Sequence, residues 1–215
     1  MSILSPALLG AVSLVLIAAA IGHLRSPAEL RSGLRAHDVL PQGAQHTVAA
    51  VLGPLEAVLG VAALVVAVVA VPPGAALAVS MPIAGLFLAF TGYLWQVLRT
   101  TEGQVVPCAC GLGATPVSQS AVLRGGILAV AAISGGIAGS GGIAGSGWSL
   151  AAAPAPEIGV ALAAMLVLAL AIALLPAARA VPEAAISHPG TRQQNHDKNA
   201  GTTNETPLFF GGETR

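Results

Sequence analysis

The chain has 215 residues, of which 55% are apolar, 8% charged and 3% aromatic, and its formal net charge at neutral pH is zero. A soluble domain carries about a quarter charged residues, so this composition excludes an ordinary water-soluble protein. It also excludes the basic stripe with which proteins bind nucleic acids, and we expect no nucleic-acid partner. The sequence therefore predicts a polytopic membrane protein that lies in the lipid bilayer.

Five apolar runs are long enough to cross a bilayer, which takes roughly 20 helical residues. They lie at 3–24, 47–71, 74–98, from about 120 onward, and 158–175. Continuous runs favour helices over the short alternating segments of a β-barrel. The first run lacks a preceding basic residue and is longer than the apolar part of a signal peptide, which favours a retained helix. The predicted fold is an all-α membrane protein, a bundle of four to five transmembrane helices.

A polar tail follows the predicted bundle. From about Pro182 the chain is rich in Gly, Thr, Asn and Pro, and it has too few aliphatic residues to bury a core. We therefore expect a transmembrane bundle over residues 1–180 and a disordered cytoplasmic tail over residues 181–215. Inside the bundle, GGIAGS occurs twice, at 135–140 and 141–146. Because glycine weakens helices, this repeat is expected to fray the fourth helix into an outer loop.

The positions of the basic residues predict the orientation of the bundle. All nine lie between the first two runs, beside the gap between the third and fourth runs, or after the fifth run. With five spans, these three places share one side of the membrane. The positive-inside rule then puts the N-terminus outside, and the gap and the tail in the cytoplasm. The predicted location is the cell membrane.

The only two cysteines, Cys108 and Cys110, stand in the polar gap EGQVVPCACGLGATPVSQS. Two thiols one residue apart close a small, strained disulfide ring, and strain makes a disulfide prone to exchange. Pro107 and the glycines after the pair predict an exposed turn that an incoming thiolate can reach. Because the chain has no second dithiol, exchange must involve another protein or a small thiol. The alternative is that each cysteine is a small apolar residue, as in many membrane helices.

A metal is the weaker interpretation of these cysteines. A structural zinc site takes four ligands, and no further cysteine or nearby histidine is present in the chain. We expect neither a metal nor a cofactor. A quinone stays open as an electron acceptor, although no second dithiol is present to feed one.

Glu56, in VLGPLEAVLGV, is the second candidate residue. An ionisable group at membrane depth costs about 2.5–3.5 kcal/mol on insertion scales, which makes it a functional-site hypothesis by default. Pro54 frees a backbone carbonyl one turn earlier and adds polarity to the neighbourhood. A protonated carboxyl that serves packing alone is the equal alternative. The side chains predicted to anchor helices at the membrane interface are His23, Arg25, Tyr93 and Trp95.

Three segments resemble the MauE family of methylamine-utilisation membrane proteins, which are related to DoxX-like four-helix proteins. These segments are IGHLRSPAELRSGLRAHDVLP, LGPLEAVLGVAAL and CACGLGATPVSQSAVLRGGILAV, and the resemblance covers roughly residues 10–135. It implies that Cys108 and Cys110 match the family's cysteine pair, Glu56 its helix-two glutamate and Arg124 its helix-four arginine. His23 stands at the family's basic residue closing helix one. Gly111-Leu112-Gly113 departs from the family, which usually has an aromatic residue before its glycine.

The resemblance implies a role in maturing the disulfide-rich small subunit of methylamine dehydrogenase, beside a thioredoxin-like partner. That maturation happens outside the cytoplasm, whereas the arginine count places the cysteines inside. Either the cysteines pass electrons outward from a cytoplasmic thiol donor, or the arginine count misleads. Two functions follow. One is a membrane thiol–disulfide oxidoreductase that uses Cys108, Cys110 and Glu56 on a client thiol protein. The other is a non-enzymatic carrier or scaffold with a cavity around Glu56.

Overall fold

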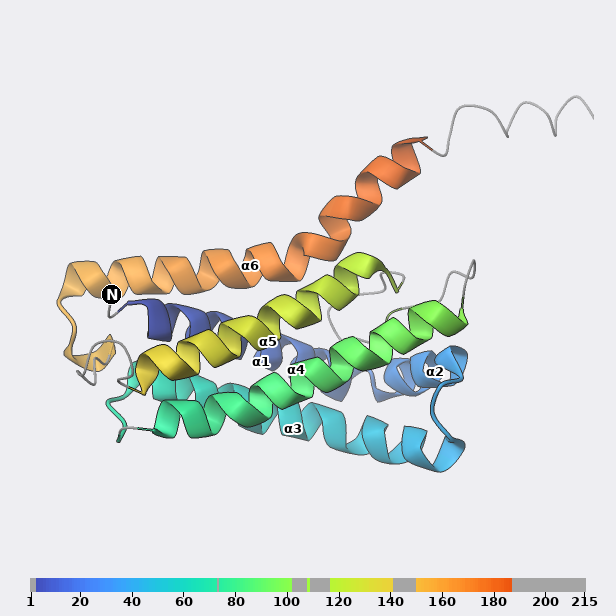
Figure 1. Cartoon of the computed structure of the whole chain (residues 1–215), viewed down its shortest axis with the longest axis horizontal. Helices are drawn as coiled ribbons and strands as arrows, with labels where there is room; N and C mark the ends of the chain where they lie inside the picture. Colours follow the sequence, from blue (N-terminus) through green and yellow to red (C-terminus); the bar gives the residue numbers. More distant parts are fainter. Residues whose placement is uncertain (1–2, 73, 102–107, 109–116, 141–149, 187–215) are drawn as a thin grey trace, which may run out of the picture. The chain divides into compact units, whose positions relative to one another are not determined.

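The computed structural model of the chain describes residues 3–72, 74–101, 108, 117–140 and 150–186. The chain divides into two units, residues 1–178 and residues 179–215. The described secondary structure is helical, in agreement with the predicted all-α fold (Figure 1). In chain order the elements are α1 (Leu4–Arg25), α2 (Pro27–His37), α3 (Gln42–Val68), α4 (Ala75–Thr100), α5 (Gln119–Gly139), the short 3-10 helix η1 (Leu150–Ala152) and α6 (Ala155–Ile186).

Five of these helices are long and apolar enough to cross a membrane: α1, α3, α4, α5 and the part of α6 over Ala155–Leu174. Their outward faces carry large aliphatic side chains that are more than half exposed, including Val58, Leu88, Val130, Val167 and Leu174. Water would penalise so much exposed apolar surface by roughly 25 cal/mol per Å². These faces are therefore lipid-facing, and the chain is a multi-pass membrane protein.

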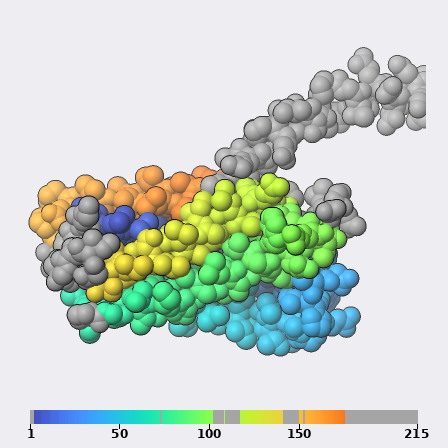
Figure 2. All heavy atoms as spheres, viewed as in Figure 1, coloured from blue at the N-terminus to red at the C-terminus, as the bar shows by residue number. Residues whose placement is uncertain are grey.

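The helix α1 is the most buried of the five spans. In its most apolar stretch of 18 residues, 61% is buried, against 22% in the corresponding stretch of the α6 span. It packs along α3 and α5, and Figure 2 shows little of it between the neighbouring helices. Ser13 Oγ donates a hydrogen bond to the carbonyl of Gly60 in α3 at 2.8 Å. Ser5 Oγ donates to the carbonyl of Gly135 in α5 at 2.9 Å. Small residues allow such close approach between membrane helices.

The helix α2 lies between the first two apolar runs, where no helix was predicted from the sequence. Pro27 opens the helix, where its missing N–H costs nothing. Leu30 and Leu34 are buried one turn apart, whereas Arg31 and Arg35 are exposed. This is the i, i+4 pattern of an amphipathic helix. The pattern was readable from the sequence, but its two leucines are too few to stand out beside five long apolar runs.

Asp38 ends α2 with φ +49°, in the left-handed region that favours glycine. We expect Asp38→Gly to raise the free energy of unfolding by about 1 kcal/mol, because a left-handed conformation costs a side-chain-bearing residue roughly 1–2 kcal/mol. Asp38→Ala is the control and should be neutral or destabilising, since alanine keeps the Cβ. The thermal midpoint of the purified protein measures both, and equal midpoints for the two variants would contradict the prediction.

The expectation that GGIAGS frays the fourth helix is wrong for its first copy. The helix α5 continues to Gly139, and Ser140 caps it. Tertiary packing explains this result, because Gly135 lies against Leu8 and Leu9 of α1. The close contact with a neighbouring helix offsets the low helix propensity of glycine. The second copy, 141–146, lies outside the described residues.

The helix α6 runs to Ile186, past the predicted end of the fifth run at Leu175 and past the start of the polar tail at Pro182. A proline inside a helix removes one hydrogen bond, and neighbouring groups in a membrane protein can compensate for it. Residues 187–215 lie outside the described residues, so disorder of the tail stays a prediction.

Candidate functional site

Glu56 lies near the middle of α3, and its side chain faces the interior of the bundle. Its Oε2 is 2.7 Å from Nδ1 of His23, on the last turn of α1. The two side chains are only 11% and 3% exposed. A buried carboxylate or imidazolium is costly in an apolar medium, and a close hydrogen-bonded partner offsets much of that cost. The predicted ionisable residue at membrane depth is therefore held by a specific partner.

Gly53 allows the end of α1 to reach Glu56. It lies three residues before Glu56, on the same face of α3. A Cβ at Gly53 would lie 3.2 Å from the side chain of Leu24 and 3.4 Å from Cβ of His23. Such distances leave little room for a side chain, so the glycine sets how closely the two helices pack. The segment LGPLE thus contains Glu56, which supplies the carboxylate, and Gly53, which leaves room for His23 beside it.

The interpretation of His23 as an interfacial anchor is wrong. The residue is 5% exposed and pairs with Glu56 inside the bundle. The sequence signal was present, because histidine is rare in membrane spans and usually faces the bundle interior. It was outweighed by the position of His23 near the end of an apolar run. Arg25, two residues on, is exposed as an interfacial residue should be.

Arg124, near the start of α5, is 4% exposed. It lines a small cavity of about 30 Å³ together with His23 and Glu56. The remaining lining is apolar or backbone, from α1, α3, α4 and α5. A space of this size holds one or two waters. Three ionisable side chains from three helices therefore meet around a cavity of water size.

Cys108 lies between α4 and α5 and is 6% exposed. It belongs to a small apolar cluster with Leu94 of α4 and Ala121 of α5, and Phe90 and Tyr93 pack against this cluster. The expected exposed turn is therefore wrong for Cys108, because the ends of two helices enclose the side chain. Cys110, together with Pro107, Gly111 and Gly113, lies outside the described residues.

Two shared elements connect Cys108 with the cavity around Glu56. Phe90 packs against the Cys108 cluster and also lines the cavity. On α5, Ala121 contacts the cluster and Arg124 lines the cavity, three residues later on the same helix face. The predicted cysteine, glutamate and arginine thus belong to one region of the bundle.

A histidine–tyrosine pair completes this region, and the sequence analysis missed it. Nδ1 of His37 is 2.7 Å from the hydroxyl oxygen of Tyr93, and the ring centroids are 5.6 Å apart. The pair lines an apolar groove of about 390 Å³ between α2, α3 and α4. Tyr93 was predicted as an interfacial anchor, but α2 partly covers it. Trp95 is 49% exposed, with the guanidinium of Arg99 5.3 Å from its ring centroid, as suits an anchor.

Within the described part of the chain, no three His, Cys, Asp or Glu side chains gather closely enough to hold a metal ion. What the arrangement offers is proton handling, by a carboxyl and an imidazole in hydrogen-bond contact, close to a buried thiol.

Comparison with known proteins gives one finding. Residues 1–138 match the family model described as methylamine utilisation protein MauE. The match covers α1 to α5 and includes both cysteines, Glu56 and Arg124. No curated protein and no solved structure matches the chain.

Proposed function

The chain belongs to the MauE family, and from this premise we propose that it is a membrane thiol–disulfide exchanger with Cys108 and Cys110 as its dithiol. The observation that carries the proposal is the position of Cys108, buried beside the region where His23, Glu56 and Arg124 meet. Thiol exchange needs a thiolate and a group that takes or returns its proton. This region supplies candidates for both.

We assign different roles to the two cysteines. Cys108 is enclosed by α4 and α5, so a protein partner reaches it poorly, and we make it the resolving cysteine. Cys110 then carries the bond to the partner. In the oxidising direction, a client thiolate attacks Cys110 of the Cys108–Cys110 disulfide, and Cys108 leaves as a thiolate. A second client thiolate then attacks the mixed disulfide, which leaves the client oxidised and the exchanger reduced by two electrons.

Glu56 serves this cycle as a proton carrier. Each turnover moves two protons together with two electrons, and the thiolate of Cys108 must be protonated or stabilised after it leaves. The hydrogen bond between His23 and Glu56 gives the proton a path between two buried groups. A thioredoxin-like partner re-oxidises the dithiol through its own disulfide.

The family model is described as methylamine utilisation protein MauE, and the client is the one that the resemblance to this family implies. We propose that the chain supports maturation of the methylamine dehydrogenase small subunit and thereby methylamine metabolism. We assign this activity to the bundle, residues 1–180, and place it in the cell membrane. The side of the membrane decides how the pair meets this client. The basic residues beside the gap favour the cytoplasmic side, whereas direct attack by a client thiolate requires the outer side, where the small subunit matures.

The redox state of the cysteines in intact cells tests the proposal. Cells are quenched with acid, and thiols are labelled with maleimide–polyethylene glycol before and after reduction. We expect labelling only after reduction in a fraction of the protein, because an exchanger cycles through its disulfide. An impermeant thiol blocker applied first reports the side of the membrane. Reaction with it places the pair outside, within reach of this client, and protection makes a cytoplasmic thiol protein the direct partner.

Single variants assign the roles. In Cys108→Ser the resolving thiol is absent, so a mixed disulfide on Cys110 should accumulate on non-reducing gels and vanish on reduction. Cys110→Ser should accumulate less than a tenth as much, and the double variant none. Thiols that stay reduced in the wild type under every growth condition would refute the exchanger.

The carrier alternative predicts full function without cysteines and sensitivity at Glu56 alone. The cavity at Glu56 holds about 30 Å³, which is room for water and not for a metabolite. This volume is why we prefer the exchanger. Full function of the double Cys→Ser variant in client maturation would reverse that preference.

A further inference from the structure

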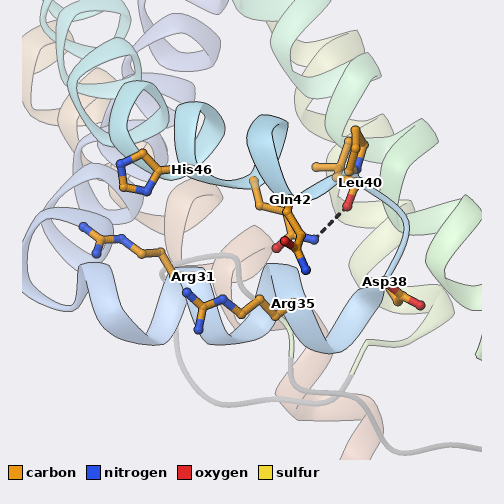
Figure 3. Close-up of a pocket in the computed structure, with 8 residues that line it drawn as sticks. Arg31, Arg35, Asp38, Leu40, Gln42 and His46 are labelled. Carbon is orange, nitrogen blue, oxygen red and sulfur yellow. Dashed lines mark hydrogen bonds between the residues drawn. The ribbon is translucent and has the colours of Figure 1, made fainter.

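A polar pocket of about 630 Å³ lies where α2 turns into α3, apart from the cysteine and Glu56 (Figure 3). It is lined by Arg31, Arg35, Asp38, Leu40, Pro41, Gln42, Gln45 and His46. From this pocket we propose that the protein binds an anionic phospholipid, with the phosphate headgroup between Arg31 and Arg35. The proposal is independent of the exchange activity.

The charge in the pocket is positive. Arg31 and Arg35 are one turn apart on α2, so both guanidinium groups lie on the same exposed face. Figure 3 shows both side chains on the same side of the pocket as His46, whereas Asp38 points away from them. Neither arginine forms an ion pair with a carboxylate of the described chain. Two guanidinium groups with their donors available are well suited to phosphate oxygens.

The start of α3 adds to the positive electrostatic potential of the pocket. Pro41 precedes a helix of 27 residues whose first residue, Gln42, faces the pocket. The N-terminus of a helix carries a partial positive charge that favours anions. Gln45 fixes the turn, because its side-chain amide donates a 2.7 Å hydrogen bond to the carbonyl of Leu40 (dashed in Figure 3). The turn that forms one wall of the pocket is thus fixed by a hydrogen bond from a buried side chain to the backbone.

The surroundings identify the anion as a lipid. The pocket lies between the end of one span, α1, and the start of the next, α3, which is the depth of lipid headgroups. Leu40 also lines the apolar groove of about 390 Å³ between α2, α3 and α4. An acyl chain that leaves the pocket past Leu40 enters a groove lined by Leu34, Val48 and Val51. A polar pocket that continues into an apolar groove matches a phospholipid.

Native mass spectrometry of the full-length protein, released from detergent with added phosphatidylglycerol or phosphatidylcholine, tests the proposal. We expect tighter binding of phosphatidylglycerol and a 20- to 30-fold loss of affinity in Arg31→Gln/Arg35→Gln, since each arginine near an anionic surface contributes about fivefold. Arg25→Gln/Arg99→Gln is the matched control, because it removes the same charge outside the pocket. It should change affinity less than about threefold.

Three results would overturn the proposal. The first is unchanged binding of phosphatidylglycerol in Arg31→Gln/Arg35→Gln, and the second is an equal loss of affinity in the control Arg25→Gln/Arg99→Gln. The third is displacement of the lipid by millimolar inorganic phosphate, which would make the site one for free phosphate. Gln42→Glu gives a second test through an exposed residue that contacts no core. It adds a negative charge to the pocket and should weaken binding of phosphatidylglycerol at least fivefold, whereas Gln42→Ala should not.

Discussion

Replacing Glu56 with leucine should lower the free energy of unfolding by about 3–5 kcal/mol, because it removes the carboxyl that holds His23 inside the bundle. Leucine has a similar volume, so the loss reports the interaction and not a cavity. His23→Leu should cost a similar amount. Titration of the purified protein with a denaturing detergent, followed by helical circular dichroism, measures the change.

A double-mutant cycle separates this interaction from packing. If the two side chains are coupled, His23→Leu/Glu56→Leu should cost less than the sum of the single variants by at least 1 kcal/mol. Glu56→Gln keeps a hydrogen-bonding group at the same position and should cost only about 1 kcal/mol. Simple additivity of the two leucine variants would mean that the 2.7 Å contact contributes nothing to stability.

Gly136→Val should destabilise the protein by about 1–3 kcal/mol or more, by forcing α4 and α5 apart. A Cβ at Gly136 would overlap the side chain of Ser80 and lie 3.3 Å from the carbonyl oxygen of Ala76. The serine can rotate, but the backbone of α4 cannot yield without moving the helix. The same face of α5 carries Gly125, whose Cβ would overlap the side chain of Thr91. These two glycines set the spacing of the two helices.

Gly126→Ala provides the control within the same helix. Apart from its own helix backbone and chain neighbours, no atom lies within 4 Å of the position its Cβ would take, so alanine should be neutral or stabilising by up to about 1 kcal/mol through helix propensity. Gly125→Ala should behave like Gly136→Val, with a smaller loss. If Gly136→Val and Gly126→Ala had the same thermal midpoint, the close approach of α4 and α5 would be disproved.

The spans could be predicted from the sequence because hydrophobicity alone decides which segments enter lipid. All five apolar runs became helices, with shifts at their ends where packing or an included proline decides the boundary. α2 was missed because two leucines at i, i+4 are a weak local signal, and the stability of the helix comes from burying Leu30 and Leu34 against the bundle. The first GGIAGS copy stays helical for the same reason, since its glycines serve contacts with other helices.

The site was predictable in its chemistry but not in its pairing. Glu56 and Cys108 stood out because ionisable residues and thiols are rare in the apolar part of this chain, and Arg124 came from the resemblance to the MauE family. That His23 pairs with Glu56 depends on how α1 and α3 cross, which a linear pattern does not encode. The burial of Cys108 could not be predicted either. The glycines and the proline around it in the sequence predict a turn, whereas its burial depends on Leu94 and Ala121, which enclose it.

The burial of α1 has a consequence for biosynthesis. This helix leaves the ribosome before its partners, which are Gly60 of α3, Gly135 of α5 and Met165 of α6, the last of which lies against Gly10. Until then Ser5 and Ser13 face lipid without the carbonyls that later accept their hydrogen bonds. During most of its synthesis the nascent chain therefore holds α1 without the helices against which it packs in the folded protein. We expect chains that end before α3 to be degraded by membrane quality control, because their α1 lacks the helices that accept its hydrogen bonds.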